Sequence, residues 1–264
     1  MEYTTISSVR YFSILQVIFF VIPIIYLIKD NKNNFSSYQV IDSTMLNPSL
    51  WQQTKDVLKI NLDFKPEVLV YMLWGILGLT LFEVGGSTII EALIPSGLVE
   101  GYNSLMKNFF EAQTELVSNH SKTISEFLQI CFFIAILPAI CEEILFRGYL
   151  MQNIMKRNSK TYAIVISALI FSLIHFNPIG LLPIFVSGLY LGALFYATKS
   201  IVIPMTIHFL SNFLVIISVN YGDPNFQLNN IWIAILLFVL GSFVLILTYK
   251  KIIKISQVNT SCIY

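Results

Sequence analysis

Two adjacent glutamates, Glu142 and Glu143, and an arginine, Arg147, lie inside a long apolar run of the sequence. An ionised side chain within a bilayer costs about 2.5–3.5 kcal/mol even on insertion scales, so such a group indicates a specific use. If the run is a helix, Glu143 and Arg147 are i,i+4 neighbours that can neutralise each other. Glu142 points about 100° away from them. The spacing therefore predicts one carboxylate in a structural pair and one, Glu142, free for chemistry.

Two histidines and an asparagine occur in later apolar runs. His175 follows Phe171 at i,i+4 spacing, and His208 precedes Asn212 at the same spacing, so each pair shares a helix face. The remaining histidine, His120, falls in a connecting segment. A lone buried histidine or asparagine is usually a satisfied structural residue, and Asn212 alone could join two helices by hydrogen bonds. Their occurrence together with the glutamates favours a functional site.

Residue counting predicts that these side chains lie at a similar depth. The chain turns at about Asn158–Ser159, and Glu142 and His175 each lie 16–17 residues from that turn. Equal separations along an antiparallel helical hairpin give equal levels, so these two side chains can face each other. His208 lies about 12 Å along its own helix. We expect the three to converge in the cytoplasmic half of the membrane.

The composition is that of an integral membrane protein. The 264 residues are 56% hydrophobic and 12% charged, against about 25% charged residues in a soluble domain, and the mean hydropathy is +0.73. A net charge of +1 argues against a nucleic-acid partner. Of the three cysteines, two lie in apolar runs, so no disulfide framework is expected.

The predicted fold class is all-α, a polytopic bundle of about seven transmembrane helices, because a span needs about 20 apolar residues. The seven candidate spans lie near 11–28, 68–90, 124–150, 161–176, 180–198, 201–219 and 231–249. We read 11–28 as a retained span because no small-residue cleavage site follows it. Three regions are predicted: 1–123 with two spans and long loops, a catalytic helical core at 124–219, and 220–264 with the last span and a tail.

The lysines and arginines between the spans predict the orientation in the cell membrane. If the spans alternate, twelve of these residues fall on one side and only Arg10, Lys107 and Lys122 on the other. The positive-inside rule puts the richer side in the cytoplasm. The N-terminus is then outside and the C-terminus is cytoplasmic. The twelve are Lys29, Lys32, Lys55, Lys59, Lys65, Lys156, Arg157, Lys160, Lys199, Lys250, Lys251 and Lys254.

Several features keep more than one interpretation. Glu83 lies in the span near 68–90 and suits an interfacial or structural role better than a role in the site. Gly188 and Gly192 form a small-xxx-small pattern that we assign to helix packing. Residues 29–67 resemble a mobile cytoplasmic loop. Within 95–123, apolar residues at helical spacing fit either an interfacial amphipathic helix or an ordinary surface helix. They are Leu105, Phe109, Ala112 and Leu116.

Three sequence motifs resemble those of the CPBP family, which contains CAAX prenyl proteases and bacteriocin-processing or self-immunity membrane proteins. The segment Glu142–Glu143–Ile144–Leu145–Phe146–Arg147–Gly148 resembles its first motif. Phe171 to His175 resembles the second, FxxxH, and His208 to Asn212 the third, HxxxN. Order and spacing match over residues 124–219. Each motif alone is weak, but the three together are specific.

The resemblance implies an intramembrane endopeptidase that hydrolyses a peptide precursor or a membrane protein within the lipid bilayer. It implies that Glu142 is the general base for water and that His175 assists it. His208 and Asn212 would stabilise the oxyanion, a role that fits a neutral imidazole and an amide as hydrogen-bond donors. Glu143 and Arg147 would hold in place the helix that carries the first motif.

The metal question stays open at the level of sequence. The family is often described as metallopeptidases, and Glu142, His175 and His208 could form a His₂Glu zinc site with a water. However, the helical HExxH spacing is absent, and zinc at Glu142 would leave Glu143, which Arg147 holds, as the base. We favour a mechanism without metal, with zinc as the alternative.

Three other function classes compete. Buried Glu and His also mark transporters, but no inverted repeat is visible. A di-iron protein needs Glu-x-x-His pairs, and the sequence has none. A non-catalytic immunity or scaffold protein of the same fold is the remaining alternative, although every motif position is intact.

Overall fold

The computed structural model describes residues 59–62, 66–102, 104, 124–221 and 228–261. All regular secondary structure in these residues is helical. The helices are α3 (Glu67–Leu93), α5 (Ile124–Ile130), η1 (Cys131–Ile136), α6 (Leu137–Glu143), η2 (Ile144–Met151), α7 (Gln152–Met155), α8 (Lys160–Leu173), α9 (Leu181–Thr198), α10 (Val202–Tyr221) and α11 (Ile231–Ser261). Residues 96–102 form a further short helix. The all-α fold class is confirmed.

Five of the predicted spans are confirmed as long apolar helices, so the chain is a multi-pass membrane protein by length and composition. They are Glu67–Leu93, Ile124–Met155, Leu181–Thr198, Val202–Tyr221 and Ile231–Ile255. The span predicted near 161–176 is the apolar helix α8, which has only 14 residues. The span at 11–28, His120, Cys262 and most of the 29–67 and 95–123 segments lie outside the described residues. The count of seven spans and the orientation of the termini stay predictions.

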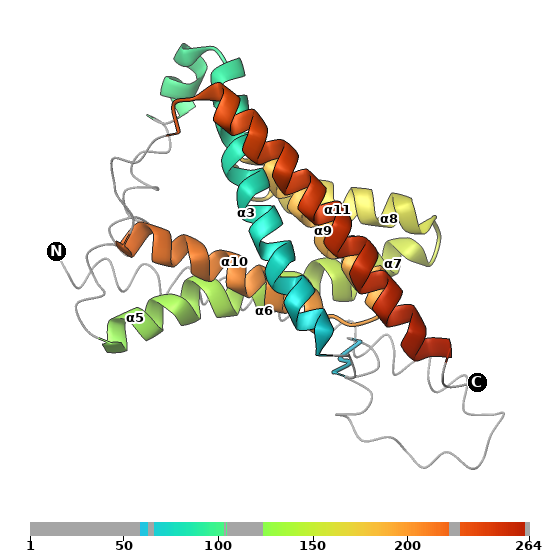
Figure 1. The fold of residues 1–264 in the computed structure, drawn as a ribbon. Helices are drawn as coiled ribbons and strands as arrows, with labels where there is room; N and C mark the ends of the chain where they lie inside the picture. The colour runs from blue at the N-terminus through green and yellow to red at the C-terminus, as the bar shows by residue number, and fades with distance from the viewer. Residues whose placement is uncertain (1–58, 63–65, 103, 105–123, 222–227, 262–264) are drawn as a thin grey trace, which may run out of the picture.

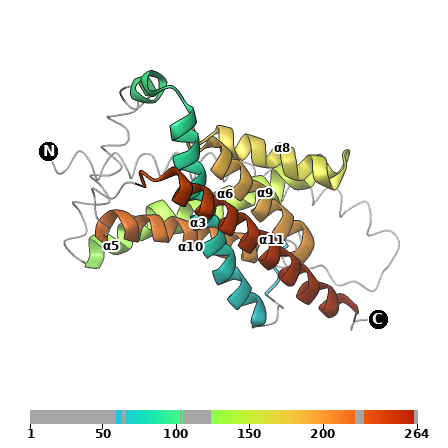
Figure 2. The same ribbon diagram turned by 45° about the horizontal axis from the view of Figure 1, so that its top comes forward.

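Helices α3 and α11 form an antiparallel pair along most of their length (Figures 1 and 2). Small residues allow the two backbones to approach closely, as is common between membrane helices. A Cβ atom at Gly241 would lie 2.5 Å from the backbone nitrogen of Phe82, and one at Gly85 would lie 2.5 Å from the carbonyl oxygen of Ala234. Glycine is therefore required at both crossing points.

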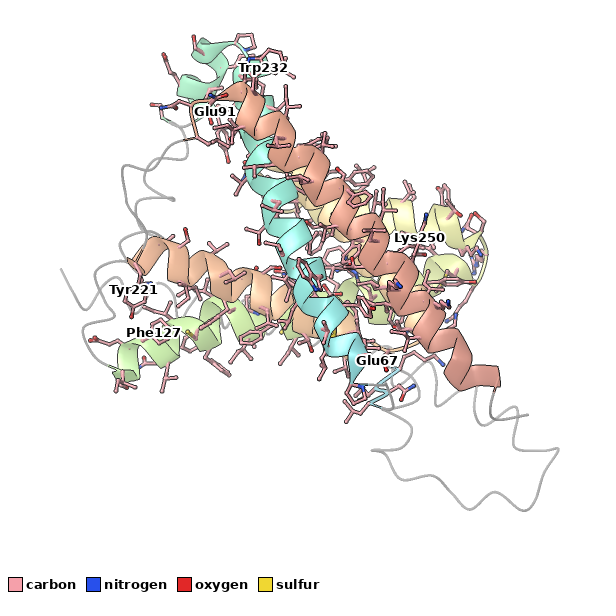
Figure 3. All side chains as sticks on the ribbon, viewed as in Figure 1. Glu67, Glu91, Phe127, Tyr221, Trp232 and Lys250 are labelled. Carbon is pink, nitrogen blue, oxygen red and sulfur yellow. The ribbon has the colours of Figure 1, made fainter. Side chains whose placement is uncertain are left out.

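A second pair is formed by α10 and the helix that begins with α5. Figure 1 shows these helices running together away from α3 and α11, and Figure 3 places Phe127 and Tyr221 at their far ends. Phe127 packs edge-on against Phe213, with ring centroids 6.3 Å apart. Ile130, Ala135 and Ile216 are buried between the pair. At its other end, this pair enters the rest of the bundle, where Glu142 and His208 lie.

The long helix from Ile124 to Met155 is not uniformly α-helical. Pro138 has no N–H group for the carbonyl one turn earlier, and the turn before it widens, so that the N–H of Leu137 bonds to the carbonyl of Phe132. A second π-helical segment, η2, follows Glu143 directly. Such segments are frequent at functional sites. The short α6, which carries both glutamates, is thus bounded by π-helical turns on both sides.

Several basic residues predicted to be cytoplasmic gather at one end of the bundle. The backbone N–H of Ile201 bonds to the carbonyl of Lys59 at 3.0 Å. The ammonium groups of Lys160 and Lys199 lie 5.2 Å and 4.0 Å from the centre of the Tyr196 ring. The connection before α3, the start of α8 and the end of α9 are therefore neighbours, as alternating spans require.

Candidate active site

The glutamate pair and Arg147 are buried where α6 meets η2. Nη1 of Arg147 donates to Oε1 of Glu143 at 2.7 Å. Both side chains are at most 1% exposed. Nη2 of Arg147 donates to the carbonyl oxygen of Gly188 in α9 at 3.0 Å. The i,i+4 pair expected from the sequence is present. The pair also anchors α9, which the sequence did not indicate because a backbone carbonyl leaves no mark in the residue type.

His208 is held between the two glutamates. Its Nδ1 lies 2.9 Å from Oε1 of Glu143. The carboxylate pairs with Arg147 and is ionised, so it accepts and Nδ1–H donates. The Nε2 atom of His208 faces Glu142, 3.8 Å from its Oε2. Glu143 therefore orients a second site residue as well as balancing Arg147, a contact that sequence analysis missed.

His175 lies just beyond the end of α8 and not within a helix. The helix ends at Leu173, and Phe176 adopts a left-handed conformation with φ 48°. Asn177, which follows, precedes Pro178, and a residue before proline disfavours helical geometry. Nδ1 of His175 lies 2.6 Å from the carbonyl oxygen of Phe171, to which it donates. Its Nε2 is left facing Oε2 of Glu142 at 4.0 Å.

Phe171 forms the apolar wall of the cluster. Its ring centre lies 4.7 Å from that of His175 and 5.8 Å from that of His208, and both ring pairs are edge-on. The guanidinium carbon of Arg147 lies 4.9 Å from the same ring centre. The sequence placed Phe171 on the His175 face. It could not show that one ring contacts three polar side chains from three segments of the chain.

Three buried oxygen atoms have no hydrogen-bond partner among the described residues: Oε2 of Glu142, Oε2 of Glu143 and Oγ of Ser211. Buried polar atoms are almost always paired, so each exception calls for an explanation. Oε2 of Glu142 is the atom that both Nε2 atoms face. The Glu142 side chain is 11% exposed and that of His175 is 31% exposed, so the cluster is reached from the His175 side.

Asn212 lies one helical turn after His208 on α10 and is half-buried. In the part of the chain that the structure describes, its amide makes no hydrogen bond. Glu142, His175, His208, Glu143 and Arg147 are brought into one cluster by the contacts above. Asn212 lies on the adjoining turn, without a measured contact to them.

The cluster can do two kinds of chemistry. Both imidazoles donate from Nδ1, so in their neutral forms each presents a lone pair at Nε2 toward a carboxylate oxygen. A water molecule fits such a gap, because it can donate to two acceptors about 2.8 Å from its oxygen. A histidine whose other nitrogen is bound to a carbonyl or carboxylate is also the usual form of a metal ligand.

The comparison with protein families gave one match. Residues 124–214 match the family model described as Rce1-like, type II CAAX prenyl endopeptidase. This range contains α5 to α9 and the first two thirds of α10, and with them every residue of the cluster. No curated protein and no solved structure matched the chain.

Proposed function

We propose, on the premise that residues 124–214 belong to the Rce1-like family of type II CAAX prenyl endopeptidases, that this protein is an intramembrane endopeptidase acting through Glu142. The family is a protease family, and five helices among the described residues are apolar and long enough to cross a membrane. The single observation that carries the proposal is the unpaired Oε2 of Glu142, which lies 3.8–4.0 Å from two imidazole nitrogens.

In the proposed reaction, a water molecule lies between Glu142 and His175. It donates one hydrogen to Oε2 of Glu142 and the other to Nε2 of His175, so that a lone pair of its oxygen points away from both. Glu142 takes a proton as this oxygen attacks the peptide carbonyl carbon, and later returns it to the leaving nitrogen. A positioned general base of this kind contributes about 10²–10⁴-fold.

His208 and Asn212 are proposed to stabilise the oxyanion. Because Nδ1–H of His208 is used on Glu143, a neutral His208 has no hydrogen left for substrate. The role therefore needs the doubly protonated ring, whose Nε2–H would donate to the carbonyl oxygen. Two carboxylates flank the ring. The amide of Asn212 would be the second donor, and Glu143 and Arg147 would hold His208 in place.

The residues also fit zinc by donor type. Glu142, His175 and His208 would hold the ion, and it would supply an acidified water and a Lewis acid. Zinc on Glu142 would leave Glu143 as the base, and Glu143 is already held by Arg147 and His208. We therefore favour the mechanism without metal.

The proposal is tested with the purified full-length chain in liposomes and a library of membrane-associated peptides, in water enriched in oxygen-18. Hydrolysis places the label in the new C-terminal carboxylate of the product, which mass spectrometry detects. Glu142→Gln is the control and should give no labelled product. The substrate itself, which we propose is a peptide precursor or a membrane protein, can be sought by comparing membrane proteomes with and without active protein.

A chelator separates the two mechanisms. An enzyme that works without metal keeps its rate after treatment with a strong chelator and after addition of Zn²⁺. Stoichiometric zinc that is lost together with activity, and restored together with it, would show that the preference is wrong.

The alternative is a non-catalytic immunity or scaffold protein of the same fold. It predicts that Glu142→Gln keeps the cellular phenotype of the wild-type protein, whereas the protease loses it.

A further inference from the structure

Glu83 is a carboxylate in the middle of α3, which has no other charged residue between Glu67 and Glu91. The helix lies outside the segment that matches the family model. A charged group at this depth is costly and indicates a definite use. Oε1 of Glu83 accepts a hydrogen bond of 2.7 Å from Oγ of Ser187 in α9, and Ser187 is buried.

This hydrogen bond is the first link of a polar chain that ends in the proposed active site. Ser187 is followed by Gly188, whose carbonyl oxygen accepts from Nη2 of Arg147 at 3.0 Å. The other arm of Arg147 donates to Oε1 of Glu143 at 2.7 Å. The same oxygen accepts from Nδ1 of His208 at 2.9 Å. Five helical segments, α3, α9, η2, α6 and α10, are joined in this order.

The position of Gly188 is also fixed from its other side. A Cβ atom at Gly188 would lie 3.1 Å from Cα of Ala168 and 3.3 Å from Cδ1 of Phe171 in α8. Segment 187–188 of α9 is therefore held between α8 and the Glu83 carboxylate of α3. Any displacement of this segment moves the Gly188 carbonyl that holds Arg147. It also changes the contact with the Phe171 ring, which packs against both histidines.

We propose that Glu83 is a positioning residue for the active site, acting through Ser187 and the Gly188 carbonyl on Arg147, Glu143 and His208. The inference rests on the proposed function for its effect on turnover. It assigns Glu83 to the support of the site and not to the reacting atoms. The acceptor oxygen performs this role and not the charge, so a glutamine at this position can replace the glutamate.

The test compares Glu83→Gln with Glu83→Leu in the full-length protein. Glutamine keeps an acceptor for Ser187, whereas leucine has a similar size and none. Glu83→Gln should keep kcat within about threefold, and Glu83→Leu should lower kcat by about 10- to 100-fold, because it leaves the buried Ser187 hydroxyl without an acceptor. KM should change little, because the peptide contacts remain.

Ser187→Ala provides a milder variant that removes the same hydrogen bond from the other partner. It should lower kcat by a similar factor, and the double variant Glu83→Leu/Ser187→Ala should be no worse than the more impaired single variant, since one interaction is lost. Thr80→Val is the matched control on α3, because among the described residues the Thr80 hydroxyl bonds only within its own helix, to the carbonyl of Ile76. It should leave kcat unchanged.

A second readout does not depend on catalysis. Cys141 is buried immediately before Glu142, so its alkylation rate, measured with Cys131 and Cys262 replaced by serine, reports the opening of α6. Glu83→Leu and Ser187→Ala should speed alkylation, and Glu83→Gln and Thr80→Val should not. If these alkylation rates are found in a protein that cleaves no peptide, the proposed function is refuted, but the positioning role of Glu83 is still supported.

Two results overturn the positioning role while leaving the proposed function intact. One is wild-type kcat and wild-type alkylation in Glu83→Leu. The other is a Glu83→Gln variant as impaired as Glu83→Leu, because the charge and not the hydrogen bond would then be what the site uses.

Discussion

The α3–α11 pair and the polar cluster around Glu142 are held together by different means. In the pair, Gly78, Gly85 and Gly241 bring two backbones into contact, and a Cβ atom at any of them would meet neighbouring atoms at 2.5–3.1 Å. In the cluster, charged groups hold the helices at defined distances and leave the Glu142 oxygen without a partner. Lipid tails are as apolar as leucine, so close packing and hydrogen bonds must replace hydrophobic burial in both regions.

The difference suggests that one region, the α3–α11 pair, which we call the frame, supports the bundle. The other region, the polar cluster, carries out the chemistry. A contact between glycines tolerates no added atom, but it has no polar group that a substrate could use. A cluster of ionised groups is costly to bury, and it keeps a carboxylate ready to act. The following variants test whether the two regions are separate in this sense.

The largest effect is expected for Glu142→Gln. If Glu142 acts as the general base of the cluster, its loss should lower turnover by at least about 10²–10⁴-fold. The yield of folded protein and its unfolding temperature should not change, because Oε2 of Glu142 makes no hydrogen bond among the described residues. Initial rates and thermal unfolding in detergent measure both. Near-wild-type turnover would remove Glu142 from the proposed role.

Glu143→Gln should act on stability as well as on chemistry. It leaves the completely buried Arg147 without its ion pair, and removing one partner of a buried pair costs about 3–5 kcal/mol. Denaturant unfolding should show the loss. The matched control is Glu91→Gln, at an exposed position near the end of α3, which should leave the unfolding curve in place. Equal stability of the two variants would contradict a structural role for the ion pair.

Asn212→Ala sharpens the comparison within the cluster. Removal of one oxyanion donor lowers kcat by about 10²–10³-fold, while expression and stability should stay close to wild type. Steady-state kinetics on the purified protein provide the measurement. Under the zinc alternative, asparagine is a poor ligand and the variant should lose much less activity, so a decrease of only a fewfold would favour that alternative.

The smallest effect is expected in the frame. Gly241→Ala places a methyl group 2.5 Å from the backbone nitrogen of Phe82, and such overpacking costs about 1–3 kcal/mol. The rate per folded molecule should be unchanged. Gly97→Ala is the control, because a Cβ atom at Gly97 would have no neighbour within 4 Å. A loss of kcat without a loss of stability in Gly241→Ala would show that frame and chemistry are coupled.

The sequence allows the helices and the depth of the key residues to be predicted. Apolar length marks the spans, and counting from the hairpin turn predicts that Glu142 and His175 share a level. In the structure, their facing atoms are 4.0 Å apart. Depth along a helix follows from the rise per residue, which is nearly constant. Ion pairing at i,i+4 follows from the same regularity, and Glu143 and Arg147 form the expected pair.

The remaining features depend on rotation about helix axes and on backbone groups. The Gly188 carbonyl that holds Arg147 is an acceptor that every residue carries, so its use cannot be recognised from residue type. The bond between Glu83 and Ser187 joins residues 104 positions apart, and no local pattern links them. His175 lies beyond the end of α8, which the structure ends at Leu173, whereas apolar character alone extends the predicted span to residue 176.

The π-helical turns around α6 give the chain an uneven tolerance to changes in length. A π-helical turn bonds residue i to residue i+5, one residue more than an α-helical turn. A deletion of one residue within Cys131–Ile136 is absorbed when the bonding returns to the α-helical pattern, and the glutamates keep their direction. The same deletion within Leu137–Glu143 has no extra residue to absorb it, and one residue corresponds to a rotation of about 100°. A deletion before the glutamates can therefore shorten the helix and keep the Glu142 carboxylate directed at the two imidazoles. A deletion a few positions later turns this carboxylate toward the lipid or a neighbouring helix.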